Sequence, residues 1–249
     1  MSSAVEVFGP TIAAIKYGVI YADPPWAFQT FSANGHGRSA EAHYDCMSLD
    51  GIRSLPIADV ADRNAVLLLW ARDPMIPAAI DLIKDWGFEF KTVGFYWAKL
   101  NKRAPGLCVS ADDFFTGMGY WTRGNVEQCL LATRGKPLRR NKGVRKLVIS
   151  PRREHSRKPD EIHDRIEALV DGPYLELFSR TGRLGWDSWG AQAGLFDAGH
   201  AETRRRSSYS KPREQRSAAR TASDEPKRTL EELWAATDPS QPLGSPSSN

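Results

Sequence analysis

The sequence predicts an α/β fold in which a mostly parallel sheet is covered by helices on both faces. Continuous apolar runs at residues 19–22 and 66–70 are typical of strands that are buried on both sides. Apolar residues at helical spacing follow the second run, over residues 76–86. Strand and helix patterns then alternate along the chain, which is the order that builds parallel sheets.

The elements expected in the first half of the chain follow from this pattern. The strand at 19–22 stops at two prolines, which cannot donate to a sheet, and residues 27–44 are polar and predict a long loop. The strand at 66–70 leads into the helix at 76–86, which Gly87 ends. The rest is a strand over residues 88–99, rich in β-branched and aromatic side chains, and a second long loop over 101–118.

The second half of the chain continues the alternation. A strand is expected at residues 127–133, then a basic loop at 134–146 and a short strand at 147–149. Pro159 suits the first position of a helix, whose acidic first turn is favourable near the helix N-terminus. The apolar face of this helix is Ile162, Ile166, Leu169 and Val170, and a strand at 174–178 follows it and leads into Gly182, Gly185 and Gly190.

Composition divides the chain into a domain and a tail. The 249 residues are 41% hydrophobic and 26% charged, as in an ordinary soluble protein. We expect one domain at residues 1–196. Residues 197–228 almost lack large apolar side chains, so we expect the tail at 197–249 to be disordered, apart from a short helix at 229–236.

The net charge and the cysteines indicate which kinds of partner and which cellular compartment to expect. A net charge of +4 fits a polyanionic partner, although many proteins without one are equally basic. The three cysteines form no Cys-x-x-Cys pair, which favours a reducing cytoplasm. We find no signal peptide and no apolar run of about 18 residues, so no membrane association is expected. His155 and His163 have no cysteine or carboxylate at ligand spacing, so no metal site is expected.

The most informative motif is Asp23-Pro24-Pro25-Trp26, at the end of the first expected strand. In open α/β sheets ligands bind at the carboxyl ends of strands. The Asp23 carboxylate and the Pro24 carbonyl only accept hydrogen bonds, and Trp26 adds a flat apolar face. Such a set fits a planar base with an exocyclic amino group, whose nitrogen can then attack a methyl group on a sulfonium. The alternative is a strand ended by a Pro-Pro turn, with Trp26 in the core.

Three runs of the sequence resemble the MT-A-seventy family of N6-adenine methyltransferases. They are Tyr21-Ala22-Asp23-Pro24-Pro25-Trp26, residues 153–161 (REHSRKPDE), and residues 175–180 (LELFSR) continued by 185–190 (GWDSWG). The resemblance spans about residues 15–195. It implies a Rossmann-like fold that uses S-adenosyl-L-methionine to methylate adenine in nucleic acid. The tetrapeptide precedes the glycine-containing run, which implies a permuted motif order.

The resemblance also implies roles for single residues. Asp23, Pro24, Pro25 and Trp26 would be catalytic, Asp23, Lys158, Arg180 and Gln192 would bind the donor, and Tyr44 and Glu127 would contact the substrate. Apart from the resemblance, the basic loop with Arg139 and Arg140 suits a phosphate backbone. The sequence departs from the family pattern at Ala191, where an asparagine is common beside the donor ribose.

Several alternatives stay open at this point. Lys158, Arg180 and the basic loop also fit a solvated surface, and Tyr44 and Glu127 match the family less well. DNA is favoured over RNA by analogy with stand-alone members of the family. A non-catalytic nucleic-acid-binding subunit and a methyltransferase for protein amides are further alternatives. The sequence gives no oligomeric state.

Overall fold

The computed structural model describes residues 2–26, 47–102, 110–117, 119, 121–152, 157–179 and 182–190. Of the candidate site residues, Tyr44, Arg180 and Gln192 lie outside these ranges, and so do His155, Ala191 and the helix expected at 229–236. The division into a domain at 1–196 and a tail therefore stays a prediction. No helix in the described ranges is long and apolar enough to cross a membrane.

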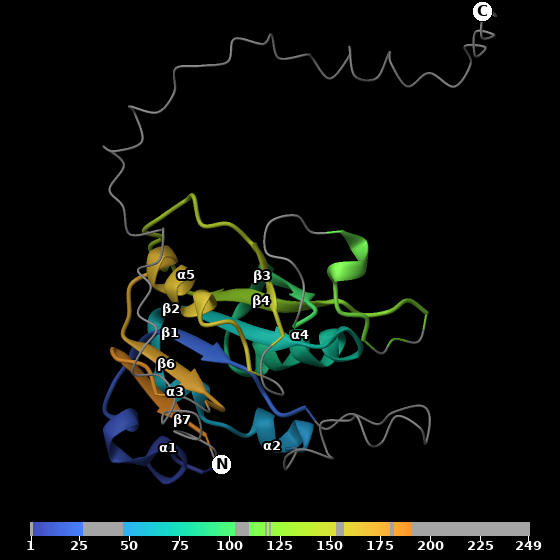
Figure 1. Cartoon of the computed structure of the whole chain (residues 1–249). Helices are drawn as coiled ribbons and strands as arrows, with labels where there is room; N and C mark the ends of the chain where they lie inside the picture. The colour runs from blue at the N-terminus through green and yellow to red at the C-terminus, as the bar shows by residue number, and fades with distance from the viewer. Residues whose placement is uncertain are drawn as a thin grey trace, which may run out of the picture. The chain divides into compact units, whose positions relative to one another are not determined.

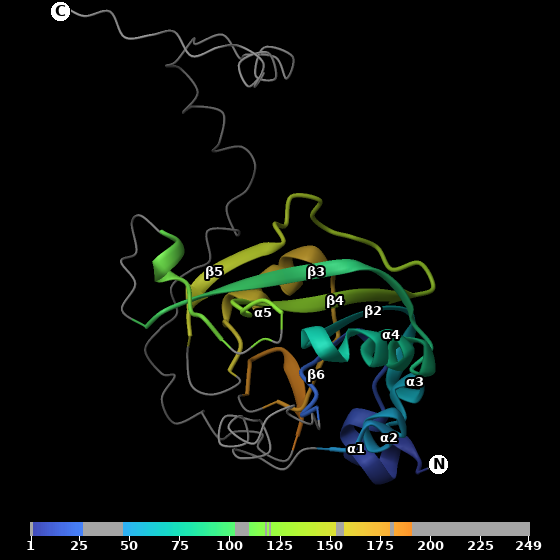
Figure 2. The ribbon, with the colours of Figure 1, turned by 90° about the vertical axis from the view of Figure 1, so that its right-hand side faces the viewer.

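Seven strands form one curled sheet in the order β5-β3-β4-β2-β1-β6-β7 (Figures 1 and 2). Four neighbouring pairs are parallel, and only β4 runs antiparallel to the strands on its two sides. The prediction of a mostly parallel sheet is thus confirmed. The strands are β1 (Tyr17–Ala22), β2 (Ala61–Ala71), β3 (Glu89–Leu100), β4 (Val126–Arg134), β5 (Leu147–Pro151), β6 (Tyr174–Leu177) and β7 (Trp186–Trp189).

Helices cover both faces of the sheet (Figure 1). On β2, Leu67 and Leu69 pack into one apolar cluster, and Leu68 and Trp70 pack into another on the opposite face, as the two-residue period of a strand requires. The first cluster includes α1 (Ala4–Ala13), α2 (Leu49–Arg53), α3 (Ile57–Val60) and α4 (Ile76–Asp85). The second cluster includes α5 (Glu161–Leu169), and we call this side of the sheet the α5 face.

Some elements differ from the sequence prediction. The pattern did not indicate α1, α2, α3 or β7. Gly9, with φ of 80°, interrupts α1, and α2 and α3 have only five and four residues, too few for a helical period to be visible. The helix expected to begin at Pro159 begins at Glu161, after one turn in which the Pro159 carbonyl accepts from the Ile162 N–H.

Strand β1 lies at the point where the sheet changes its winding direction. It pairs in parallel with β2 on one side and with β6 on the other. The chain leaves β1 toward β2 and returns much later to β6, so the connections at the ends of these strands diverge. Ligands of open α/β sheets bind at such a switch point, outside the carboxyl ends of the strands. We call this side of the sheet the carboxyl edge.

Candidate active site

Asp23 and Lys158 form an ion pair at the carboxyl edge. Asp23 directly follows β1, and Lys158 belongs to the segment that enters α5. The Lys158 Nζ donates to Asp23 Oδ2 at 2.5 Å and lies 3.6 Å from Glu127 Oε2. It also lies 5.1 Å from the centroid of the Trp70 ring. The Lys158 side chain is only 11% exposed, so these charged and aromatic groups stabilise an ammonium that has little contact with water.

Glu127 connects Lys158 to a second lysine. The Lys99 ammonium, from the neighbouring strand β3, donates to Glu127 Oε1. Burial by itself would raise the pKa of Glu127, but the charges of Lys158 and Lys99 outweigh this effect and lower its pKa to about 2. Glu127 is therefore ionised at neutral pH. A chain of alternating charges thus crosses four segments of the fold, and its members are Asp23, Lys158, Glu127 and Lys99.

The two prolines give the tetrapeptide a tight turn. The Trp26 N–H donates to the Pro24 carbonyl at 2.8 Å, and the Met47 N–H donates to the Pro25 carbonyl at 3.1 Å. A carbonyl oxygen has two lone pairs, so Pro24 can accept a second hydrogen. Trp26 is 5% exposed and packs in the core on the side of α1 to α4. It is thus a buried support, which is the core position that the sequence left open.

Trp70 supports three parts of the site. Its carbonyl accepts from Trp26 Nε1 at 3.1 Å, and its own Nε1 donates to the Tyr21 hydroxyl at 2.7 Å. Its ring lies beneath the Lys158 ammonium. Tyr21 stands two residues before Asp23 on β1, so Trp70 contacts the last residue of the tetrapeptide and the strand that leads into it. The sequence prediction named Trp70 only as the end of a strand.

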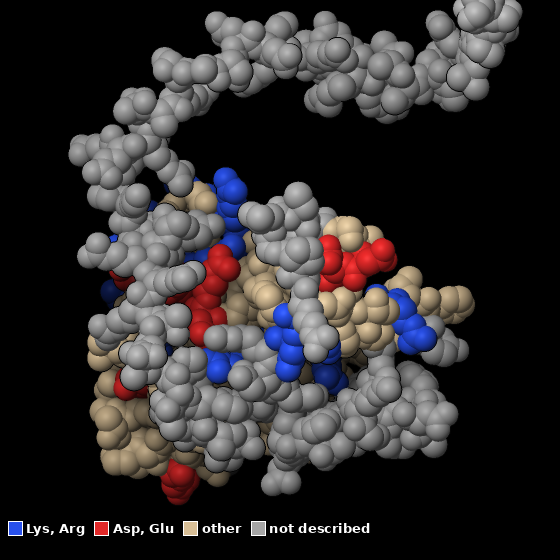
Figure 3. All heavy atoms as spheres, viewed as in Figure 1, with Lys and Arg blue, Asp and Glu red and all other residues tan. Residues whose placement is uncertain are grey.

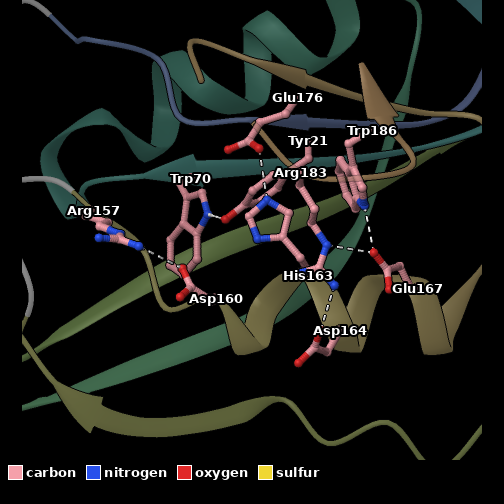
Figure 4. A network of polar contacts seen from close by, with 10 residues as sticks. All are labelled: Tyr21, Trp70, Arg157, Asp160, His163, Asp164, Glu167, Glu176, Arg183 and Trp186. Carbon is pink, nitrogen blue, oxygen red and sulfur yellow. Dashed lines mark hydrogen bonds and ion pairs between the residues drawn. The ribbon is translucent and has the colours of Figure 1, made fainter. Parts of the chain in front are cut away.

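A polar network fixes α5 to the sheet behind this site (Figure 4). His163 Nε2 lies 2.9 Å from Glu176 Oε2 on β6, and the imidazole packs edge-on against Tyr21. Glu167 accepts from Trp186 Nε1 on β7 at 2.8 Å and from Arg183. Because α5 is held in this way, the segment before it is held as well, and this segment carries Lys158.

The structure does not bring Arg139 and Arg140 to the carboxyl edge. The Arg140 N–H donates to the Leu169 carbonyl at the end of α5, and its guanidinium lies 3.0 Å from Asp171 Oδ1. Asp171 precedes β6, so both arginines lie near the amino ends of the parallel strands. Asp23 stands at the opposite end of β1.

Among the candidate residues, the structure does unite Asp23, Lys158 and Glu127. The whole chain can also be compared with known proteins. The family model described as MT-A70 matches residues 17–192. The chain belongs to the MT-A70 family. The fold is accordingly that of a Rossmann-like methyltransferase, which confirms the resemblance found in the sequence.

Three relatives show how much of the chain this likeness covers. The type II methyltransferase M.MunI of a Mycoplasma species is 31% identical over 205 residues, which are 75% of this chain and 82% of that protein. The N(6)-adenosine-methyltransferase MT-A70-like protein of Drosophila melanogaster is 29% identical over 66% of this chain and 24% of its own length. Human METTL3, an N(6)-adenosine-methyltransferase catalytic subunit, is 28% identical over 66% of this chain and 26% of its own length.

In this MT-A70 chain, the end of β6 has an unusual backbone. Phe178 adopts a φ of 61°, a left-handed conformation that is uncommon for a bulky residue. The Ser179 N–H donates to the Trp189 carbonyl at 3.1 Å, and a Cβ atom at Gly190 would lie 2.8 Å from the Ser179 nitrogen. Only glycine therefore fits at position 190 without a shift. This close turn lies beside Asp23, because β6 pairs with β1.

The sequence prediction did not include two residues of this site, Lys99 and Trp70. Both could have been found from their positions in the sequence. Each stands at or near the end of an expected strand, where the carboxyl-edge rule applies. Within the described residues no group of three or more His, Cys, Asp or Glu side chains is arranged to hold a metal ion.

Proposed function

We propose that this protein transfers a methyl group from S-adenosyl-L-methionine to the N6 amino group of adenine in nucleic acid, with DNA as the substrate rather than RNA. The observation that carries the proposal is the Asp23–Lys158 pair at the switch point of the sheet. The membership of the MT-A70 family and the methyltransferase names of the relatives support it.

On the adenine side, Asp23 and Pro24 are the groups that orient the amino nitrogen. The Asp23 carboxylate and the free lone pair of the Pro24 carbonyl accept the two amino hydrogens. Held in this way, the nitrogen lone pair leaves conjugation with the ring and points toward the methyl group. Most of the rate enhancement then comes from positioning and electrostatics, and no strong base is needed.

On the donor side, the charges present fit the groups of S-adenosyl-L-methionine. The donor supplies an activated methyl group on a positively charged sulfur. Lys158 is the cation for its carboxylate, and the Asp23 and Glu127 carboxylates favour its positive centres. Lys158 therefore exchanges its contact with Asp23 for the donor carboxylate, which frees Asp23 for adenine. Arg180 and Gln192 are the proposed contacts to the donor ribose.

DNA is preferred as the substrate because of the extent of the match. The chain covers 82% of the type II methyltransferase M.MunI, but only about a quarter of METTL3, an N(6)-adenosine-methyltransferase catalytic subunit. In a duplex the target adenine must be flipped out of the stack, because its amino group is paired inside. A non-catalytic binding subunit is disfavoured because Asp23 is present and paired with Lys158. The cytoplasmic location stays a prediction.

The test is methyl transfer from labelled donor to DNA and RNA oligonucleotides of the same adenine-containing sequence. We expect N6-methyladenine in digested DNA, detected by mass spectrometry, and its loss in Asp23→Asn with an unchanged circular dichroism spectrum. Asp81→Asn is the matched control, because Asp81 is an exposed residue of α4 whose ion pair, at 3.2 Å, is to Lys84 of the same helix. Transfer to RNA alone would reassign the substrate, and full activity of Asp23→Asn would refute the role of Asp23.

A further inference from the structure

A row of polar side chains continues beyond Asp23 along the carboxyl edge, on the α5 face. Glu127 pairs with Trp97, which packs in the cluster on the α5 face, so Glu127 faces that side too. Lys99 is two residues beyond Trp97, and it pairs with Ser150 of β5. From β1 to β5 there are four strand-to-strand steps of about 4.8 Å, so the row extends for about 19 Å.

Arg152 stands at the far end of this row. Its N–H donates to the Leu100 carbonyl at 3.0 Å, which continues the pairing of β5 beyond Pro151. The guanidinium carbon lies 3.5 Å from the centroid of the Phe115 ring, and Phe115 is held by a hydrogen bond from its N–H to the Lys99 carbonyl. The ring therefore sets the plane of the guanidinium.

The charge of Arg152 is not neutralised by the described part of the protein. Its Nε is buried and has no hydrogen-bond partner, and the guanidinium makes no ion pair with any described residue. A guanidinium can donate two parallel hydrogen bonds to the oxygens of one phosphate. The group is available for such a contact when its plane is fixed and no carboxylate is paired with it.

Arg72 occupies a similar position in the middle of the row. It follows β2 with extended backbone, two residues after Trp70, so its side chain is on the α5 face. It makes no ion pair within the described residues, although its charge is close enough to help lower the pKa of Glu127. In contrast, Arg140 at the opposite edge is already paired with Asp171.

Net charge by itself does not locate a binding surface. On the face shown in Figure 3, basic and acidic side chains are interspersed and form no single patch. Unpaired arginines beside the active site are therefore a more specific indication than the basic loop at 134–146.

We propose that Arg72 and Arg152 bind phosphates of the DNA strand that carries the target adenine, with Phe115 holding the guanidinium of Arg152. This inference rests on the proposed function, and it moves the phosphate contacts from Arg139 and Arg140 to the carboxyl edge. Because phosphate contacts release counterions, each one adds to the salt dependence of DNA binding.

The test measures binding of a fluorescent adenine-containing DNA duplex by fluorescence anisotropy, without donor, at several salt concentrations. Arg72→Gln and Arg152→Gln should each weaken binding about three- to tenfold at low salt. Each should also make the slope of log association constant against log salt concentration less steep by about 0.9. Arg152→Lys should keep most of the slope. Arg63→Gln is the matched control, since Arg63 is an exposed arginine at the amino end of β2.

Thermal unfolding of each variant separates DNA binding from a structural role. If Arg152 only anchors residues 110–117, Arg152→Gln will lower the melting temperature without changing the salt slope, which would overturn the proposal. A slope that becomes less steep for Arg139→Gln and Arg140→Gln, but not for Arg72→Gln or Arg152→Gln, would also overturn it. Methyl transfer by the wild-type protein with unchanged slopes in the variants would refute this inference alone. Absence of transfer to any nucleic acid would refute the proposed function.

Discussion

The Lys158 Nζ and Asp23 Oδ2 lie 2.5 Å apart although 135 positions separate them in the sequence. One group belongs to the residue after β1 and the other to the segment before α5. Glu127 shares the same ammonium at 3.6 Å. A donor carboxylate would therefore compete with these two carboxylates for the same ammonium.

Replacement of Lys158 tests this exchange. We expect Lys158→Met to raise the KM for the donor about 10- to 100-fold, because a charge-assisted hydrogen bond to the donor carboxylate is lost. Steady-state kinetics with varied donor at saturating DNA measure the effect. Lys158→Arg keeps the charge and should recover part of the affinity. An unchanged KM for the donor in Lys158→Met would remove Lys158 from the donor site.

The ionisation of Glu127 predicts a loss of stability in acid. Its pKa falls from 4.5 to about 2 on folding, so its contribution is complete above pH 4.5 and is lost as the pH falls toward 2. The shift corresponds to at most about 3 kcal/mol of unfolding free energy. Urea unfolding should therefore show that wild type and Glu127→Gln differ most above pH 4.5 and converge near pH 2. A difference that does not vary with pH would show that the charge of Glu127 is not responsible.

Lys99 is expected to act as a positioning residue through Glu127. Burial lowers the pKa of Lys99, and the carboxylate of Glu127 opposes this effect. In Lys99→Met, Glu127 loses one of its two cations and should draw Lys158 away from the donor. We expect the KM for the donor to rise about tenfold with a smaller change in kcat. Lys99→Arg should restore the wild-type value, whereas a purely structural role would not respond to the restored charge.

The buried hydrogen bond between Trp70 and Tyr21 is open to a double-mutant cycle. Trp70→Phe keeps a ring beneath Lys158 but leaves the Tyr21 hydroxyl without its donor, so we expect a loss of about 1 to 3 kcal/mol. Tyr21→Phe should cost a similar amount, and the double variant should cost less than the sum. Additive losses in chemical denaturation would show that the two groups do not act as a pair.

Much of the sheet could be predicted from short apolar runs in the sequence. Val19 to Ala22 and Val66 to Trp70 are apolar without alternation because both faces of their strands are covered, and this holds in the structure. The direction of β4 could not be predicted, because a strand carries no local mark of its direction. The connection from β3 to β4 contains no described α-helix, and strands joined without such a crossover pair antiparallel.

In the candidate site too, some residues could be predicted from the sequence and others could not. Asp23 was recognised from its motif, because the prolines and the strand before it are neighbours in sequence. Lys99 was overlooked and Arg139 and Arg140 were favoured, because charge is easy to count along the chain but its position relative to Asp23 depends on which edge of the sheet it reaches.

By itself the sequence determined the α/β fold class, the family and the tetrapeptide, since all of them depend on short patterns of side chains. Only the tertiary structure decided that Lys158, Glu127 and Lys99 meet at Asp23, that Trp26 is a buried support, and that Arg140 lies at the other edge. The physical reason is that these contacts join strands that are adjacent in the sheet but distant in the chain. The order and direction of those strands follow from packing of the whole domain.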